Sequence, residues 1–244
     1  MVEQARMTRY CEQYYSERPR AVGGTSYLAQ VGHTVLGKPI DDGQRDSLVD
    51  QIRDLLDLDP NDHLLDLCCG NGLFTCRLGL TCEDVVGIDV SSSLLEIARA
   101  AHSRENISYY KGDILDLDLA SLGVKSAGGF NKILMYAALQ HFNLDRFEDI
   151  LRFMTGVAAP GFVILIGFVP DRDKKWRFYN SPRRKIAHVL RALSGHELFG
   201  TWWRKEYIQG ICGRLDLECS FHELPEGLHA STYRFHIRIT RQDQ

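Results

Sequence analysis

Residues 62–90, DHLLDLCCGNGLFTCRLGLTCEDVVGIDV, decide the fold of this chain. Their first apolar run is short enough for a buried strand, and Gly70 and Gly72 interrupt it where a helix should begin. A second apolar run, 85–88, ends in Asp89. The stretch therefore predicts a strand, a glycine turn, a helix and a second strand. A turn at the carboxyl end of a parallel strand leaves helix N–H groups for an anionic part of a ligand.

The acids around this turn indicate which ligand it binds. A dinucleotide fingerprint needs a third glycine, whereas residues 73–75 are Leu, Phe and Thr. A carboxylate at Asp66 would repel a pyrophosphate but could meet a ligand ammonium, while the helix N-terminus meets a carboxylate. Asp89 stands where an acid normally holds ribose hydroxyls. An amino acid joined to a ribose indicates S-adenosyl-L-methionine.

At these residues the chain resembles the class I, Rossmann-like S-adenosylmethionine-dependent methyltransferases of the small-molecule type. Their acid and glycine-rich turn match residues 66–72, with Cys68 where the family often has its first glycine. The resemblance implies S-adenosyl-L-methionine as cofactor and S-adenosyl-L-homocysteine as product. It places the ribose acid on Asp89 and the adenine-edge acid on Asp113. The cofactor-binding residues that it implies are Asp66, Cys68, Gly70, Asn71, Gly72, Asp89, Val90, Asp113, Ile114 and Met135.

The remaining patterns extend an α/β fold along the chain. Apolar residues at helical spacing predict a helix at 46–58, and capping boxes at 93–96 and 145–148 predict two more helix starts. Further strands are expected at 107–111, 130–136, 161–169, 215–221 and 232–239. With the resemblance, this pattern predicts a doubly wound, mostly parallel seven-stranded sheet with an antiparallel last strand.

We expect a single methyltransferase domain over residues 1–244. Its parts are an N-terminal helical cap and helix (1–58), a cofactor-binding core (60–170), an insertion between strands 5 and 6 that roofs the substrate (171–211), and a terminal β-hairpin (212–244). Such a length can bury one full core.

Candidate acceptor-binding residues come first from the N-terminal segment, where tyrosines alternate with glycines. The resemblance implies a cap that closes on cofactor and substrate, so Tyr15, Tyr27 and His33 are candidates. The alternative is that these tyrosines pack the segment against the domain.

His141 is the candidate catalytic residue. It lies past the carboxyl end of the strand expected at 130–136, where a doubly wound sheet keeps its active site. Relatives place a histidine here, and in some it removes a proton from the acceptor. The alternative is a histidine that hydrogen-bonds the backbone of its loop. Tyr136, at the end of the strand, is a further candidate for contact with the acceptor.

A basic, aromatic stretch follows the fifth strand. Residues 171–205 hold ten Lys and Arg residues against three acidic ones, interleaved with aromatic residues that include Tyr179 and Trp202, both substrate candidates. Guanidinium groups bind carboxylates and phosphates in a bidentate manner, so the stretch favours an anionic acceptor. The alternative is a solvated helix face.

Composition narrows the class of protein. The formal charge is −3, which argues against a general nucleic-acid-binding surface. Seven cysteines without C-x-x-C spacing are typical of a reduced, cytoplasmic protein. Neither a signal peptide nor an apolar run of membrane-spanning length is expected, and the nine scattered histidines show no metal-ligand spacing.

The resulting hypothesis is methyl transfer to an oxygen or nitrogen of a small metabolite, either anionic or neutral: a sugar, a natural product, or a carboxylate- or phosphate-bearing acceptor. Two alternatives stay open: an RNA or protein methyltransferase that docks through 171–205, and a cofactor-binding subunit without catalysis. The oligomeric state is undetermined, with a homodimer as one candidate.

Overall fold

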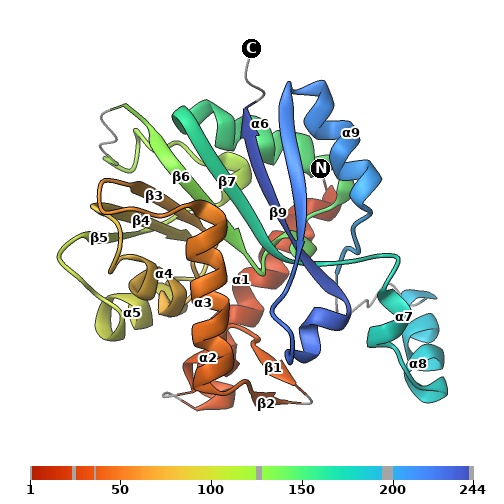
Figure 1. Ribbon diagram of the computed structural model, residues 1–244. Helices are drawn as coiled ribbons and strands as arrows, with labels where there is room; N and C mark the ends of the chain where they lie inside the picture. Colours follow the sequence, from red (N-terminus) through yellow and green to blue (C-terminus); the bar gives the residue numbers. More distant parts are fainter. Residues whose placement is uncertain (1, 24–25, 36, 125–127, 194–199, 242–244) are drawn as a thin grey trace.

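The computed structural model describes residues 2–23, 26–35, 37–124, 128–193 and 200–241, with only the backbone course described for 2–9 and 191–193. Over these residues it forms a sheet with helices on both faces (Figure 1). Glu197, one of the acids counted in the basic stretch, lies outside the described residues.

The sheet has seven strands in the order β5-β4-β3-β6-β7-β9-β8. The strands are β3 (His63–Leu67), β4 (Asp84–Asp89), β5 (Ile107–Lys111), β6 (Phe130–Tyr136), β7 (Ala158–Pro170), β8 (Leu217–Glu223) and β9 (Arg234–Arg241). The first five pair in parallel, while β9 is antiparallel to both of its neighbours. The predicted doubly wound sheet with an antiparallel last strand is therefore confirmed. Strand order reverses between β3 and β6, and in such folds this is where ligands bind.

The helices lie around this sheet (Figure 1). They are α1 (Val2–Val22), α2 (Tyr27–Gln30), α3 (Asp42–Leu56), α4 (Leu73–Leu78), α5 (Ser92–Ala101), α6 (Phe147–Val157), α7 (Lys175–Phe178), α8 (Pro182–Leu193) and α9 (Lys205–Arg214). A small hairpin joins β1 (Thr34–Val35) to β2 (Lys38–Pro39). Short 3-10 turns are η1 (Ile114–Asp116), η2 (Leu139–His141), η3 (Leu144–Arg146) and η4 (His229–Thr232).

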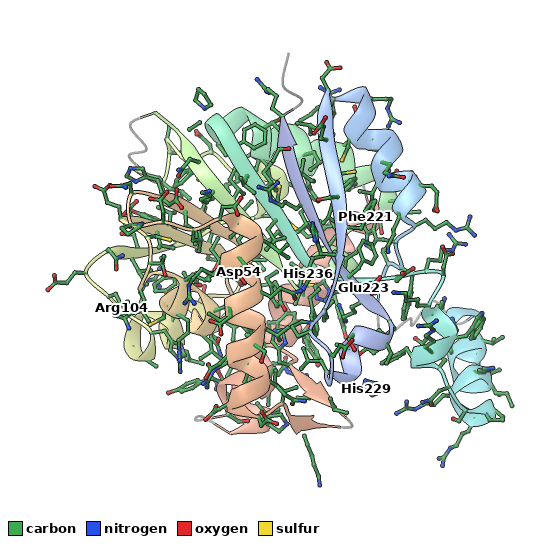
Figure 2. All side chains as sticks on the ribbon, in the orientation of Figure 1. Asp54, Arg104, Phe221, Glu223, His229 and His236 are labelled. Carbon is green, nitrogen blue, oxygen red and sulfur yellow. The ribbon has the colours of Figure 1, made fainter. Side chains whose placement is uncertain are left out.

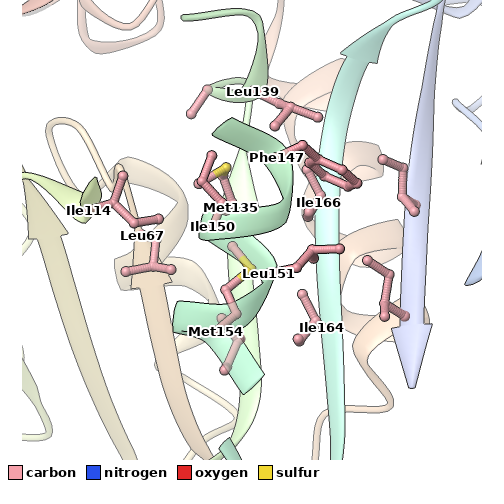
Figure 3. Packing of buried hydrophobic residues seen from close by; sticks show 14 of the residues in the cluster. Leu67, Ile114, Met135, Leu139, Phe147, Ile150, Leu151, Met154, Ile164 and Ile166 are labelled. Carbon is pink, nitrogen blue, oxygen red and sulfur yellow. The ribbon is translucent and has the colours of Figure 1, made fainter. Parts of the chain in front are cut away.

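Two apolar layers hold the helices to the sheet. Ile52 of α3 and Leu95 of α5 are fully buried in the layer on one face. Phe147 of α6 (Figure 3) is fully buried in the layer on the other face, and so is Ile208 of α9. Burying a large apolar side chain contributes about 1.5–3 kcal/mol, so these layers fix the sheet and the positions of its strand ends.

Two helix starts differ from the sequence-based prediction. Ser91, rather than Ser93, caps α5 and accepts a hydrogen bond from the N–H of Leu94. The predicted start at Asp145 instead falls in the turn η3, and α6 begins at Phe147 without a side-chain cap. Several residues near a helix start can serve as caps, and the position of the preceding strand end selects among them.

The N-terminal segment lies against the carboxyl ends of the parallel strands. Figure 1 shows α2 and the β1–β2 hairpin below these ends, and α1 contacts both α5 and η2. Cys11 of α1 and Leu28 and Ala29 of α2 are buried. The segment therefore covers the region where the sheet places a ligand.

The expected roof is arranged differently from the prediction. α7 and α8 project to one side of the sheet (Figure 1), and the apolar residues Ile186, Val189 and Leu190 of α8 are exposed. Some of the positive charge is paired: Lys174 and Lys205 both form ion pairs with Glu223 of β8. The charged surface of this insertion therefore faces solvent over most of its length.

Candidate cofactor and acceptor site

Two adjoining pockets lie at the carboxyl ends of β3, β4 and β6, with volumes of about 80 and 70 Å3. We call them together the strand-tip crevice. Tyr15, Cys68, Asp89, Ala138 and His141 line both pockets. One pocket adds Val31, His33, Asp66, Cys69, Gly70, Asn71, Phe74, Leu94, Tyr136 and Ala137, and the other adds Cys11, Val90, Gly112, Asp113, Ile114 and Phe142.

Asp66 of β3 is a buried carboxylate in this crevice. It is 2% exposed, and one of its oxygens accepts a hydrogen bond of 2.6 Å from the Thr75 hydroxyl. Burial raises its pKa to about 7, with the nearby Asp89 charge adding to the effect. No described cationic side chain forms an ion pair with it. A ligand ammonium would offset the cost of burying this charge, so the residue fits the amino group of an amino acid.

Asp89 ends the neighbouring strand β4 and is 8% exposed. Its two oxygens accept hydrogen bonds from the backbone N–H groups of Gly70 (2.9 Å) and Ser91 (2.8 Å). These contacts fix the carboxylate, while each oxygen keeps a lone pair for a further donor. The position fits a ribose whose hydroxyls donate to the acid.

The turn between β3 and α4 has left-handed backbone at three positions. Gly70 and Gly72 have φ of 59° and 74°, and Cys68 has φ of 61°. A Cβ atom on Gly70 would lie 2.8 Å from Cγ1 of Val31, so α2 and its following residue pack directly on the turn. Cys68 therefore adopts the conformation that glycine adopts most easily, which fits the glycine that the family resemblance implies at this position.

The second pocket of the crevice is bounded by η1 and α1. The Asp113 carboxylate accepts a hydrogen bond of 3.1 Å from the N–H of Leu115, which orients it at the end of β5. Val90, Ile114 and Cys11 supply an apolar wall beside it. A flat apolar slot next to an acid fits a base with an exocyclic amino group.

Two of the predicted cofactor residues have other contacts. The Asn71 amide donates to the carbonyl of Tyr27 and to Oε1 of Gln30, both at 2.9 Å, and so fastens α2 to the turn. Met135 is fully buried in the layer beneath α6 (Figure 3). Its side chain belongs to the core because alternate residues of a strand face opposite sides of the sheet.

His141 lies in η2, after β6, as predicted. Its Nε2 is 3.2 Å from the Tyr15 hydroxyl of α1 and 3.5 Å from Nε2 of Gln140. Burial, together with the charge of Arg234, lowers its pKa to about 4. The imidazole is therefore neutral near pH 7, which is the form that can accept a proton.

His33 and Tyr136 are two further predicted residues that line the crevice. They are 4% and 8% exposed, and their rings stack with centroids 5.8 Å apart. Among the described residues, neither Nδ1 of His33 nor the Tyr136 hydroxyl has a hydrogen-bond partner. Buried polar atoms are nearly always satisfied in folded proteins, so these two atoms are suited to bind a ligand.

Three predicted substrate residues lie outside the crevice. The Tyr27 ring packs edge-on against His102, with centroids 4.6 Å apart. Tyr179 stacks on His188 of α8, and Trp202 packs in the same aromatic cluster with Phe178. The placement of these three residues indicates packing roles, which for Tyr27 is the alternative that the sequence left open.

Sequence reasoning did not identify Gln140 and Arg234. The Gln140 amide group donates to the carbonyl of Ala137 (2.5 Å) and lies beside His141, and its Oε1 accepts from Arg234 at 3.4 Å. Arg234 begins β9, nearly a hundred positions away. Only the antiparallel pairing of β9 with β7 brings it to this end of the sheet, and no local pattern encodes that contact.

The structure holds no metal-like cluster of three or more His, Cys, Asp or Glu side chains within its described residues. All seven cysteines are described and are free thiols in this structure. Among the described helices, none combines the length and apolarity that crossing a membrane requires.

Comparison with known proteins agrees with this geometry. A family model described as "Methyltransferase domain" matches residues 64–161, which include β3, the glycine turn and His141. Residues 64–161 are a methyltransferase domain. The domain's strand order, glycine turn and paired acids are those that the sequence resemblance implied.

Curated relatives match the methyltransferase domain over short stretches. The 23S rRNA (uracil(1939)-C(5))-methyltransferase RlmD of Mannheimia succiniciproducens is 40% identical over 85 residues, which is 34% of this chain and 19% of that protein. Ribosomal RNA small subunit methyltransferase A of Geobacter metallireducens is 24% identical over 152 residues, 62% of this chain and 48% of that protein. The chain thus spans about a fifth of the RlmD relative and about half of the other.

Solved structures match the methyltransferase fold over nearly the whole chain. A SAM-dependent methyltransferase from Anabaena variabilis has a TM-score of 0.66 at 24% identity, covering 96% of this chain and 95% of that one. The DhpI-SAH complex has a TM-score of 0.65 at 15% identity, covering 98% of each chain. Magnesium protoporphyrin IX methyltransferase (ChlM) of Synechocystis, with bound SAM, has a TM-score of 0.62 at 14% identity, covering 97% of each.

Proposed function

We propose that this protein transfers the methyl group of S-adenosyl-L-methionine to an oxygen or nitrogen atom of a small molecule. The observation that carries the proposal is the pair of buried carboxylates, Asp66 and Asp89, at adjacent strand tips in one crevice. A ligand with an ammonium at one end and vicinal hydroxyls farther along satisfies both. The matched family domain and the ligands named in the similar structures support this choice.

Each part of the crevice has a place in this function. Asp66 would hold the amino group, Asp89 the ribose hydroxyls, and Asp113 with Ile114 the adenine edge. When bound, the cofactor supplies a methyl group that its sulfonium charge has already activated. The protein must then align the acceptor and exclude water, and alignment of this kind can contribute several kcal/mol, up to about 7–11 in well-oriented cases.

His141 has a proton-accepting role if the acceptor is a hydroxyl group. Its neutral imidazole lies in the crevice beside Tyr15, and general-base help of this kind typically contributes about 10²–10⁴-fold. A neutral amine needs no such help. The cap residue Tyr15 orients the ring through its hydroxyl and closes the crevice on the side of α1.

The enclosed form of the site favours a small molecule over RNA. α1 and α2 cover the strand tips, and Cys11 and Tyr15 of α1 are part of the crevice wall. The basic stretch that would dock RNA has Lys174, Lys205 and Arg204 in ion pairs with Glu223 and Asp173. The similarity to ribosomal RNA methyltransferases keeps RNA as an alternative, which steep salt dependence of binding would favour.

The test of this proposal is a binding and turnover assay. Calorimetry with S-adenosyl-L-homocysteine should give one site per chain, and incubation with S-adenosyl-L-methionine and a pool of small metabolites should release the demethylated product. Binding without turnover on any acceptor would favour the alternative of a non-catalytic subunit. Absence of binding would contradict the proposal.

A further inference from the structure

A second cavity of about 310 Å3 lies beside the strand-tip crevice, and we call it the arginine cavity. Its wall is mainly apolar, with two arginines and two histidines. The described residues that line it are Gly32, His33, Thr34, Val35, Ile40, Leu48, Phe168, Phe178, Arg184, Leu228, His229, Ala230, Tyr233 and Arg234. None of these is acidic. The cavity is in the size range of small-ligand pockets, whereas the crevice pockets are narrower.

Arg234 is the most buried charge in this wall, with 6% of its surface exposed. Its guanidinium lies over the Phe168 ring, 4.4 Å from the centroid, and 5.6 Å from the Tyr233 centroid. It also donates to the carbonyl of Phe168 and to Oε1 of Gln140. These contacts hold the planar group in one orientation. A fixed guanidinium in an apolar cavity recognises oxyanions better than a mobile surface arginine, because less side-chain entropy is lost on binding.

A second arginine and a histidine also line the cavity. Arg184 of α8 is half-buried and donates to the carbonyl of Phe178 at 3.3 Å. His229 lies in η4, on the turn below β9 (Figure 2). The potential inside the cavity is therefore positive or neutral. An anion entering it gains attraction from Arg234 and Arg184 without repulsion from a lining carboxylate.

The arginine cavity adjoins the crevice through His33, whose side chain lines both. The His33 ring packs against Phe74 on the crevice side and Phe168 on the cavity side, each with centroids 5.0 Å apart. The rings of His33, Phe74 and Phe168 therefore separate the arginine cavity from the crevice in which the reactive methyl group would lie. An acceptor held in the cavity would be next to that methyl group.

We propose that the arginine cavity holds the acid group of the methyl acceptor, with Arg234 as its anchor, so that the acceptor is a small organic oxyanion with an apolar or aromatic body. This inference rests on the proposed function and adds the substrate class to it. The main anion-binding residue is then Arg234, a buried residue of β9, and the exposed basic side chains of residues 171–205 are not required. Within that stretch, only Arg184 of α8 lines the cavity. Carboxylates and phosphonates share the required chemistry.

The experiment uses the full chain saturated with S-adenosyl-L-homocysteine and measures, by calorimetry or ligand-observed NMR, the binding of benzoate, phenylphosphonate and the neutral isostere benzamide. A charge-assisted hydrogen bond contributes about 1.5–3 kcal/mol, so benzoate or phenylphosphonate should bind at least about tenfold more tightly than benzamide. The tighter of the two anions identifies the oxyanion type. Equal binding of anions and benzamide would overturn the proposal, and this comparison needs no variant.

Two variants test whether Arg234 is the origin of the preference for the anions over benzamide. Arg234→Gln should abolish the preference for the anion, whereas Arg241→Gln, an exposed change on the same strand, should keep it. An unchanged preference in Arg234→Gln would remove that residue as the anchor. Displacement of benzoate by a short single-stranded RNA would overturn the small-acceptor class. Binding of S-adenosyl-L-homocysteine, measured first, separates these outcomes from failure of the proposed function.

Discussion

The hydroxyl group of Tyr15 in α1 lies 3.2 Å from Nε2 of His141, although 126 positions separate the two residues. Their rings also pack edge-to-face, with centroids 5.7 Å apart. The contact joins the N-terminal cap to the segment after β6, which carries the candidate base. The placement of α1 and the orientation of the candidate base therefore depend on the same contact.

Tyr15→Phe tests this coupling, because it keeps the ring contact and removes the hydroxyl. A net loss of about 1 kcal/mol for the hydrogen bond predicts a roughly fivefold lower turnover on an accepted substrate. Affinity for S-adenosyl-L-homocysteine should change less than turnover. Tyr10→Phe, at an exposed position of the same helix, is the control. Equal turnover of Tyr15→Phe and the parent protein would argue against the coupling.

His141→Ala should lower turnover on a hydroxyl acceptor by about 10²-fold or more, with little change in cofactor affinity. Cofactor affinity should change little because His141 lines the crevice, whereas Asp89 and Asp66 are the residues expected to bind the ribose and the ammonium. Because the pKa of His141 is about 4, its imidazole stays unprotonated between pH 6 and 8. Protonation of this residue should therefore not lower turnover in that pH range. His63→Ala, at the amino end of β3, is the matched control. A fully active His141→Ala protein would remove the residue from catalysis.

Asp66 predicts a proton release on cofactor binding. Its pKa of about 7 means that the carboxyl is largely protonated at pH 6, whereas pairing with an ammonium requires the ionised form. Calorimetry of S-adenosyl-L-homocysteine binding at pH 6, in buffers of different ionisation enthalpy, should show release of up to one proton. Asp66→Asn should show none from this group. The same release in both proteins would contradict the role of Asp66.

The raised pKa of Asp66 also has a consequence for stability. A carboxyl whose pKa is higher in the folded state adds stability that is complete below its ordinary pKa, near 4, and is lost as pH rises through about 7. Without ligand, the parent protein should therefore lose stability between pH 4 and 7 relative to Asp66→Asn, as denaturant titrations would measure. Parallel stability curves for the two proteins would count against the shift.

Asp89→Asn should weaken binding of S-adenosyl-L-homocysteine by about 1–3 kcal/mol, because ribose hydroxyls would lose a charged acceptor in a buried site. Asp54→Asn, on the exposed side of α3 (Figure 2), should leave the affinity unchanged. Isothermal titration calorimetry measures both. Parent-like affinity in Asp89→Asn would show that the sugar binds elsewhere.

Much of the fold follows from local sequence. Strands β3, β4, β6 and β7 contain apolar runs, because a parallel sheet covered on both faces selects such residues. Asp66, Asp89 and Asp113 lie in or just after the carboxyl-terminal parts of β3, β4 and β5, and the family resemblance assigned them their cofactor roles. The sheet order confirms that these strands are neighbours, whereas the cofactor roles of the three acids stay a prediction.

Other features needed the tertiary structure. The register of β6 decides on which side of the sheet the Met135 side chain lies. In the structure, this side chain packs under α6 and not in the crevice. The tyrosines and tryptophans of the insertion are equally consistent with packing and with substrate contact until α8 is placed. Arg234 and Gln140 meet only through the pairing of β9 with β7, which joins residues distant in sequence.

The decisive measurement is a crystal structure grown with saturating S-adenosyl-L-homocysteine. We expect the ligand between α1 and the strand tips, with its ammonium at Asp66 and its ribose hydroxyls at Asp89. A ligand bound away from these two carboxylates, or a crevice that stays closed by side chains at saturating ligand, would contradict this assignment of the site.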